Sequence, residues 1–173
     1  MPPIAIVLHG TTSAGKTSIA RALQESATRP TFHVPMDAFA CMSTRRHMRS
    51  DAEREEAFRL HCKCFRAAIR ELVDSQFDLV LDLVLRDEAE FEACLASLSP
   101  RQVFVIGIYA LIDVLEEREN LRNDRATGMA REQVGHSAYE RAYAMRVNTS
   151  AVSPQEAANR IRQFLSKNEQ PGG

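Results

Sequence analysis

Residues 4–17 read IAIVLHGTTSAGKT, an apolar run that leads directly into a glycine-rich loop and a lysine. From Gly10 to Thr17 the loop fits the phosphate-binding pattern G-x-x-x-x-G-K-[ST]. Glycine at positions 10 and 15 lets the backbone turn tightly and bring successive N–H groups to phosphate oxygens, where a Cβ would obstruct the approach. The pattern therefore predicts that the protein binds a nucleoside triphosphate.

The surroundings of the loop support this prediction. Residues 4–8 read as a buried parallel strand, and residues 17–27 carry apolar side chains at helical spacing. The phosphates would then lie at a helix N-terminus, which favours anions. Lys16 is expected to reach the β- and γ-phosphates during catalysis, and the Thr17 hydroxyl is expected to ligate Mg²⁺. The alternative is a glycine-rich turn without a ligand. The expected nucleotide contacts are Gly10, Thr11, Thr12, Ser13, Ala14, Gly15, Lys16, Thr17 and Ser18.

Length and composition limit the class of protein. With 173 residues, 45% of them hydrophobic, the chain suits one domain spanning 1–173. The net charge of −1 argues against nonspecific nucleic-acid binding, while most of the 22 basic residues are arginines, which suit phosphate oxygens. The apolar runs are too short to span a bilayer, and Met1-Pro-Pro lacks the basic region of a signal peptide. We therefore expect a cytoplasmic protein without a membrane partner.

The four cysteines do not form a zinc-binding spacing. Cys62 and Cys64 lie in a helical pattern, where residues two apart face different directions, and Cys41 and Cys94 are distant in sequence. We expect reduced, structural cysteines.

Apolar runs alternate with helical patterns along the chain. The expected strands are 4–8, 31–34, 79–85, 103–108 and a weaker 144–147. The expected helices are 17–27, 51–75, 87–98, 112–122, 129–140 and 154–166, the last of them capped by Ser153. This alternation predicts a three-layer α/β fold with a five-stranded parallel sheet, helices on both faces and ligands at the carboxyl ends of the strands. Residues 168–173 are expected to form a flexible tail.

Two acidic residues follow or end predicted strands. Asp37, just past the second strand, is a candidate general base that takes a proton from a substrate hydroxyl; a helix N-cap or a water-mediated Mg²⁺ contact is the alternative. Asp82 ends an apolar strand, where an unpaired acid is rare. A contact to Mg²⁺ explains Asp82, as does a charge pair or hydrogen bond with the substrate or with Lys16; a satisfied structural carboxylate is the alternative.

An arginine-rich segment spans residues 118–131. Arg118 and Arg122 share one helix face by their spacing of four, and Arg125 follows across a turn, so their guanidinium groups are expected to close on the transferring phosphates. This pattern predicts a lid. The alternative is a solvated helix end with arginines favourably placed at its C-terminus.

These motifs together resemble the chloramphenicol phosphotransferase-like family of P-loop kinases. The resemblance rests on the Ser-Ala-Gly-Lys core of the loop, on Asp37, on the run RENLRNDRATGMA at 118–130 and on VNTS at 147–150 followed by S-P-x-E-x-A. It implies a P-loop kinase fold, ATP and Mg²⁺, and γ-phosphoryl transfer to a hydroxyl of a small molecule. It further implies Asp37 as general base, Arg122 and Arg125 as lid arginines, and a turn near the adenine that includes Asn148 and Thr149.

The acceptor-binding segment, about 38–60, departs from the family pattern. It is shorter than in the chloramphenicol enzyme, and residues 41–49 read CMSTRRHMR, which suggests an acceptor with anionic or strongly polar groups rather than chloramphenicol. Simple solvation of these charges is the alternative. Asn148 stands where the family more often has an acid. The expected substrate contacts are Met36, Asp37, Phe39, Arg45 and Asp82.

Several functions fit this pattern. Drug phosphorylation, as in antibiotic resistance, and metabolite phosphorylation are two versions of one activity, and a sugar-nucleotide kinase resembling zeta toxins is a third possibility. A nucleotide-binding module with little turnover belongs to a different class. The presence of Asp37 and of the arginine run argues against that module, since a pure binder needs neither. The sequence leaves monomer and homo-oligomer equally open.

Overall fold

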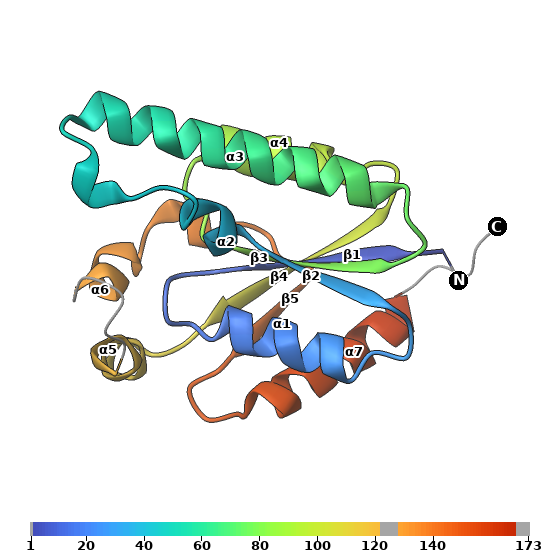
Figure 1. Ribbon diagram of the computed structural model, residues 1–173. Helices are drawn as coiled ribbons and strands as arrows, with labels where there is room; N and C mark the ends of the chain where they lie inside the picture. The colour runs from blue at the N-terminus through green and yellow to red at the C-terminus, as the bar shows by residue number, and fades with distance from the viewer. Residues whose placement is uncertain (1, 122–127, 169–173) are drawn as a thin grey trace.

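A five-stranded parallel sheet forms the centre of the computed structural model, which describes residues 2–121 and 128–168 (Figure 1). Its strand order is β2-β3-β1-β4-β5. The strands are β1 (Ile4–His9), β2 (Thr31–Pro35), β3 (Asp78–Leu83), β4 (Gln102–Tyr109) and β5 (Met145–Asn148). The helices are α1 (Lys16–Glu25), α2 (Met36–Ala40), α3 (Asp51–Val73), α4 (Glu88–Ala96), α5 (Ile112–Asn120), α6 (Met129–Gln133) and α7 (Pro154–Asn168). Short 3₁₀ turns cover Arg45–His47 and Ser137–Tyr139.

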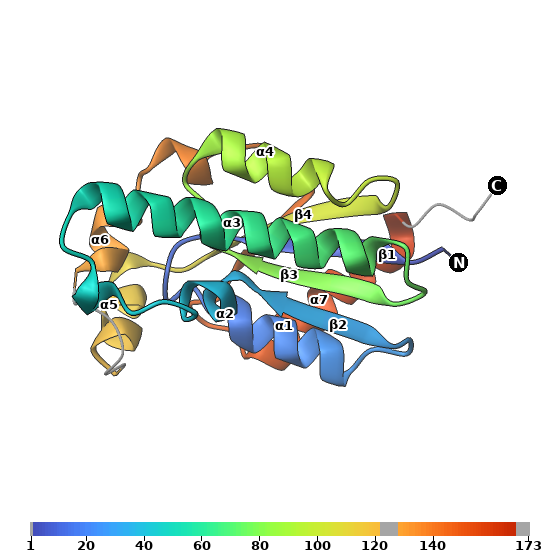
Figure 2. The ribbon, with the colours of Figure 1, turned by 45° about the horizontal axis from the view of Figure 1, so that its top comes forward.

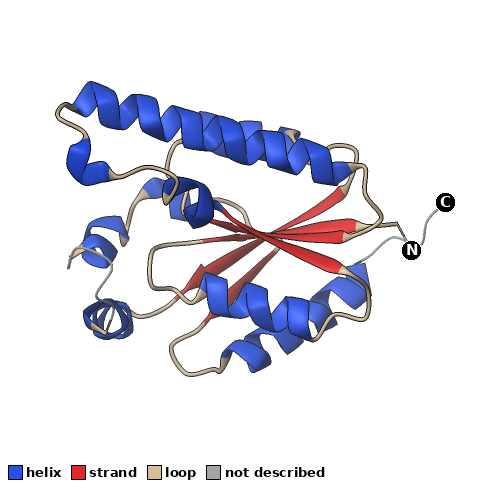
Figure 3. Cartoon of the chain, viewed as in Figure 1, coloured by secondary structure: helices blue, strands red, loops and turns tan. Residues whose placement is uncertain are grey.

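The sheet lies between two helical layers. Figure 3 shows the strands between helices on either side, and Figure 2 shows α3 and α4 together over one face. The opposite face is covered by α1 and α7 (Figure 1). The predicted three-layer arrangement with helices on both faces is therefore confirmed.

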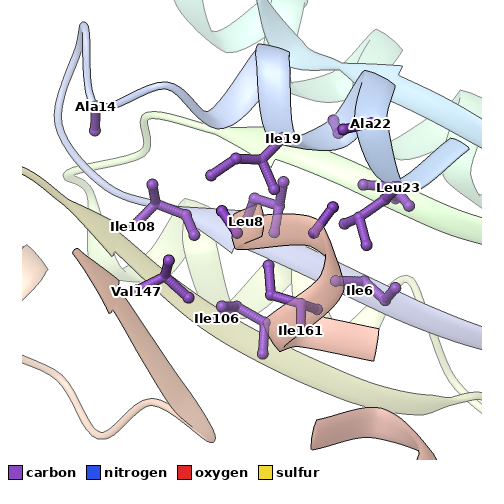
Figure 4. Packing of buried hydrophobic residues seen from close by; sticks show 14 of the residues in the cluster. Ile6, Leu8, Ala14, Ile19, Ala22, Leu23, Ile106, Ile108, Val147 and Ile161 are labelled. Carbon is purple, nitrogen blue, oxygen red and sulfur yellow. The ribbon is translucent and has the colours of Figure 1, made fainter. Parts of the chain in front are cut away.

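Each face of the sheet has its own apolar core. Every residue of β1 is buried, and its side chains alternate between the two cores, as the two-residue period of a strand requires. Toward α1 and α7, Leu8 packs with Ile19 and Ile161 (Figure 4). Toward α3 and α4, Val7 packs with Phe65 and Phe91, among others. Because β1 is buried on both faces, its continuous apolar run predicted it well.

The helices differ from the predictions at two places. The single helix expected at 129–140 is wrong, because α6 ends at Gln133 and Gly135 adopts φ of +82°, after which only a 3₁₀ turn follows. Such a left-handed residue ends a helix. The short α2 was not predicted. Pro35 lies at its N-cap position and Asp37 within its first turn, so Asp37 is not the helix N-cap.

The start of α7 agrees with its sequence pattern. Pro154 is the first helical residue, and Ser153 Oγ accepts a hydrogen bond from Glu156 N at 3.1 Å. The helix continues to Asn168, and residues 169–173 of the expected tail lie outside the described residues.

The described residues also bear on cysteines, metals and membranes. All four cysteines are free thiols, and burial raises the pKa of both Cys62 and Cys94 to about 12. Within residues 2–121 and 128–168, no group of three or more histidine, cysteine or acidic side chains is arranged to hold a metal ion. None of the helices in that part of the chain is long and apolar enough to cross a membrane.

Candidate nucleotide-binding site

The glycine-rich loop leaves the end of β1 in close contact with β4. A Cβ added to Gly10 would lie 1.9 Å from the backbone oxygen of Ile108. Farther along the loop, Ser13 has φ of +59° and Gly15 has φ of +92°, both in the left-handed region. The loop therefore needs glycine at position 10 for space and at position 15 for conformation.

We expect Gly10→Ala to destabilise the protein by roughly 3 kcal/mol, because the clash is with backbone that cannot rotate away. Gly135→Ala is a suitable comparison. A Cβ there meets open space, so it should cost only about 1 kcal/mol for the left-handed conformation. Urea unfolding of both variants measures the difference, and the reverse order of stabilities would contradict the role of Gly10.

Lys16 and Thr17 begin α1 directly after the loop. Lys16 is 5% exposed, and its Nζ donates to Thr11 O at 2.8 Å. Thr17 Oγ1 donates to Asp82 Oδ2 at 2.5 Å. Asp82 reaches this position because β3 pairs with β1, with Leu8 opposite Asp82 in the register. The structure thus brings together the three side chains expected to face the phosphates and Mg²⁺.

The charge state of Asp82 follows from its surroundings. Burial alone would raise its pKa, but the approach of His33, the charge of Lys16 and the hydrogen bond from Thr17 outweigh burial and hold the pKa below its ordinary value. His33 Nε2 lies 3.8 Å from Asp82 Oδ2, beyond hydrogen-bond length. Asp82 is therefore a carboxylate at neutral pH.

The polar atoms around the loop fit a nucleotide and its metal ion. Thr11 Oγ1, Ser13 Oγ and His33 Nε2 are buried and have no hydrogen-bond partner among the residues that the structure describes. Buried polar atoms normally have partners, so unpartnered ones beside a glycine-rich loop fit a ligand. The Thr17 hydroxyl and the Asp82 carboxylate supply the oxygen donors that Mg²⁺ prefers.

A cavity of about 340 Å³ adjoins the loop between α1, the end of α5 and the start of α7. This volume lies in the range of small-molecule sites. Its lining consists of Ser13, Gly15, Ser18, Ile19, Arg118, Leu121, Thr149, Val152, Ser153, Pro154 and Ala157. The cavity is continuous with the loop through Ser13 and Gly15, so a nucleotide with its phosphates on the loop would place its base and ribose here.

Arg118 forms one wall of this cavity. Its guanidinium donates to Thr149 Oγ1 at 2.9 Å, to Thr149 O at 2.7 Å and to Ser13 O at 3.4 Å. Arg118 thus joins α5, the turn after β5 and the phosphate loop. Asn148, which was also expected near the adenine, is exposed, and its Oδ1 accepts from Ser150 N at 2.9 Å.

The residues expected to face an acceptor begin at Asp37. This residue is exposed in the first turn of α2, which directly follows β2. In the register of β2 and β3, Pro35 at the end of β2 lies opposite Asp82. Met36 is buried in the core, and the half-buried Phe39 packs edge-to-face on Phe65 of α3 at 5.4 Å between ring centroids. Both hold α2 on α3, and their contact with an acceptor stays a prediction.

The arginines of the predicted lid are placed only in part. Arg122 and Arg125 lie outside the described residues, and Arg131 pairs with Glu116 at 2.6 Å. Arg45 begins a 3₁₀ turn, and its side chain is likewise outside the description. The lid therefore remains a prediction.

Two buried polar residues near the site were not identified from the sequence. Glu119, at 2% exposure on α5, and Gln133, at 4% exposure on α6, both accept hydrogen bonds from backbone N–H groups. Nothing in their sequence neighbourhood distinguishes them from solvated helical residues.

His9, which precedes the loop, is fully buried, and each of its two ring nitrogens forms a hydrogen bond. Its Nε2 lies 2.7 Å from Leu85 O, and its Nδ1 lies 2.9 Å from the Tyr143 hydroxyl. Because a carbonyl oxygen only accepts, Nε2 carries the proton and Tyr143 donates to Nδ1. Burial, with the charges of Arg141 and Lys16, lowers the pKa of His9 to about 4. His9 is therefore a neutral structural residue that fixes the end of β1.

The low pKa of His9 predicts a loss of stability in acid. Unfolded histidine binds a proton below about pH 6.5, whereas folded His9 does so only near pH 4, so stability falls as pH decreases across this window. Between pH 7 and pH 5 the loss should be about 2 kcal/mol. In His9→Gln this loss of stability between pH 7 and pH 5 should be absent when unfolding is measured with urea. His47→Gln, at an exposed position, is the control, and an unchanged pH dependence in His9→Gln would contradict the prediction.

Comparison with solved structures shows the same fold. A putative kinase from Chloroflexus aurantiacus has a TM-score of 0.70 at 20% identity, covering 95% of this chain and 97% of that chain. A shikimate kinase from Acinetobacter baumannii, solved with shikimate, has a TM-score of 0.69 at 17% identity, covering 98% and 96%. An APS kinase from Mycobacterium tuberculosis, solved with AMPPNP and APS, has a TM-score of 0.67 at 15% identity, covering 96% and 99%. The fold is that of P-loop kinases.

The sequence comparisons identify the family. No curated protein sequence matches the chain significantly. Residues 4–166 match the family described as chloramphenicol phosphotransferase-like protein. This match includes the phosphate loop, Asp37, Asp82 and the arginine-rich segment, and it extends nearly from end to end. The chain therefore belongs to the chloramphenicol phosphotransferase-like family.

Proposed function

We propose that the protein is an ATP-dependent phosphotransferase that moves the γ-phosphoryl group to a hydroxyl of a small molecule. The observation that carries this proposal is the cluster of Lys16, Thr17 and Asp82 at the phosphate loop. Asp37 follows the neighbouring strand at the same edge of the sheet, and the 340 Å³ cavity adjoins the loop on the other side. This arrangement suits a nucleotide and an acceptor meeting at the loop.

The residues of the site would act by positioning and by charge. The loop N–H groups and Lys16 would neutralise the phosphate oxygens as the phosphoryl group transfers. Thr17 and Asp82 would hold Mg²⁺, which supplies further charge neutralisation when bound. Asp37 would accept the proton of the attacking hydroxyl, and Arg118 with the cavity would fix the nucleoside. If the lid arginines Arg122 and Arg125 act as predicted, they would add positive charge at the transferring group.

The acceptor segment favours an anionic or strongly polar acceptor. Arg46 and Arg49 are exposed, and neither forms an ion pair with any carboxylate of the described residues. On the adjoining helix α3, by contrast, Arg54 and Arg59 pair with acids one turn away. Arginines without such partners, on the segment that follows Asp37, suit carboxylate or phosphate groups of an acceptor. Metabolites and sugar nucleotides fit this description better than an apolar drug.

A nucleotide-binding module without turnover is the second candidate. It would share the loop and the cavity with a kinase. The exposed carboxylate of Asp37 at the carboxyl edge of the sheet favours the kinase, because binding a nucleotide alone requires no base there.

Transfer from γ-labelled ATP to a panel of hydroxyl compounds tests the proposal. The panel should include antibiotics, sugars, nucleosides, sugar nucleotides and hydroxy acids. A labelled product that is absent with Lys16→Met, and present with the exposed-site control Lys63→Met, would support a kinase and identify the acceptor class. Tight ATP binding with label released only to water, across a panel that includes anionic acceptors, would favour the binding module.

A further inference from the structure

Two buried side chains connect α5 and α6 to the phosphate loop. Glu119, near the end of α5, accepts hydrogen bonds from Gly128 N at 2.8 Å and from Ala130 N at 3.1 Å. Gln133, the last residue of α6, accepts one through Oε1 from Thr12 N at 2.7 Å. Figures 1 and 2 both show α5 and α6 together beyond the carboxyl ends of the strands. A continuous set of hydrogen bonds therefore runs from α5 through α6 into the loop.

The bond from Thr12 lies beside the most constrained residue of the loop. Ser13 has φ of +59°, a conformation that is unfavourable for a residue with a Cβ and persists where its surroundings fix it. Arg118 supplies one such contact, because its guanidinium lies 3.4 Å from Ser13 O. Gln133 supplies another at the preceding residue. The backbone on either side of the Thr12–Ser13 peptide is thus held by two different helices.

We propose that Gln133 is a positioning residue for nucleotide binding, one that acts through the backbone N–H of Thr12. Its amide oxygen bonds this N–H within a buried environment and fixes the left-handed turn that follows. This turn orients the later N–H groups of the loop, together with Lys16, toward the β- and γ-phosphates. Gln133 lies outside the lining of the nucleotide cavity, so its effect on binding is indirect. This inference rests on the proposed binding of ATP at the loop.

A positioning role predicts an effect that depends on the phosphates. Gln133→Met keeps the length of the side chain but removes the acceptor. We expect the Kd of ADP and of ATP to rise about tenfold, which corresponds to the upper end of the free energy of one such hydrogen bond, because a loop no longer fixed by Gln133 must be ordered when the phosphates bind. The Kd of AMP, which lacks the β-phosphate, should change less than about twofold. Titration calorimetry with the three nucleotides measures this selectivity.

Gln24→Met is the matched control. The Gln24 amide donates to Thr31 O at 2.9 Å, at the end of α1 remote from the loop, so the same chemical change removes one hydrogen bond elsewhere. Its three dissociation constants should equal those of the wild-type protein. The proposal is overturned if Gln133→Met binds ADP as tightly as Gln24→Met does. It is also overturned if Gln133→Met loses ADP and AMP affinity equally, since that result indicates a general structural defect.

A second variant covers the case in which Gln133→Met does not fold. Gln133→Asn keeps a buried amide but withdraws it by one bond, about 1.5 Å, which is too far for the contact with Thr12 N. Gln133→Asn should show the same loss of affinity for ADP and ATP, with little change for AMP. Wild-type affinity of Gln133→Asn for ADP would count against the proposal. These titrations need no acceptor. A wild-type protein that binds ADP but phosphorylates nothing would therefore refute the proposed transferase activity while leaving the role of Gln133 to be decided by its own result.

Discussion

Replacement of Lys16 by methionine is expected to lower kcat/KM for phosphoryl transfer by about 10³-fold. Lys16 is buried in the first turn of α1, and its ammonium group reaches back to Thr11 O, so its charge lies within the phosphate loop. Methionine has a similar length and volume but no charge to meet the phosphoryl oxygens. Since negative charge develops on the leaving oxygen of the β-phosphate as its bond to phosphorus breaks, most of the loss should fall on the transition state and a smaller part on ATP binding.

The same variant should change a property that does not depend on turnover. The charge of Lys16 is one cause of the low pKa of Asp82, so this pKa should rise in Lys16→Met, as measured by NMR titration of the carboxyl group. Lys63→Met, on the exposed side of α3, should keep wild-type values in both measurements. If Lys16→Met retained roughly a tenth or more of wild-type kcat/KM, the assigned role of Lys16 would be wrong.

The central strands β1 and β3 were predictable because they are buried on both faces. Such strands read as continuous apolar runs, and β1, expected at 4–8, occupies Ile4–His9. Short elements were less predictable. The pattern at 129–140 has helical spacing throughout, but Gly135 adopts a left-handed conformation that ends it, and one glycine in a helical pattern does not by itself indicate where a helix stops.

The position of the glycine-rich loop was predictable for a different reason. A phosphate loop requires particular residue types at fixed spacing, so roles for Lys16 and Thr17 could be proposed from the pattern alone. Asp82 could be named as a candidate because it ends an apolar strand. Its hydrogen bond with Thr17, 65 positions away in sequence, depends on the pairing of β3 with β1, which the structure shows.

The supporting residues were missed because their function depends on tertiary contacts. Gln133 and Thr12 are 121 positions apart, and Glu119 accepts hydrogen bonds from residues 9 and 11 positions later, at the start of α6. In the sequence both residues lie in charged helical patterns, where a polar side chain is normally solvated. The same limit applies to the arginines after α2, since the sequence does not show which arginines have carboxylate partners.

Asp37→Asn is expected to lower kcat by about 10³-fold while the Kd of ATP stays within about twofold of the wild-type value. Asparagine keeps the shape of aspartate and can still accept a hydrogen bond from the acceptor hydroxyl, but it cannot take up the proton. Asp37 lies in the first turn of α2 and is not among the residues that line the cavity proposed to hold the nucleotide, so ATP affinity should be preserved. The Kd of ATP should rise in Lys16→Met, in contrast, because Lys16 is proposed to contact the nucleotide itself.

The size of the loss distinguishes two functions of the carboxylate. In a loose transition state the hydroxyl keeps its proton until late, so a carboxylate that mainly orients the hydroxyl would be worth less than one that removes its proton. A loss of less than about 10²-fold would indicate orientation, whereas the expected loss of about 10³-fold lies within the range of proton removal. Asp74→Asn, an exposed position where α3 ends, should leave kcat and the Kd of ATP unchanged. Wild-type turnover in Asp37→Asn would exclude Asp37 as the base, and the proton would then pass directly to solvent or to a phosphate oxygen.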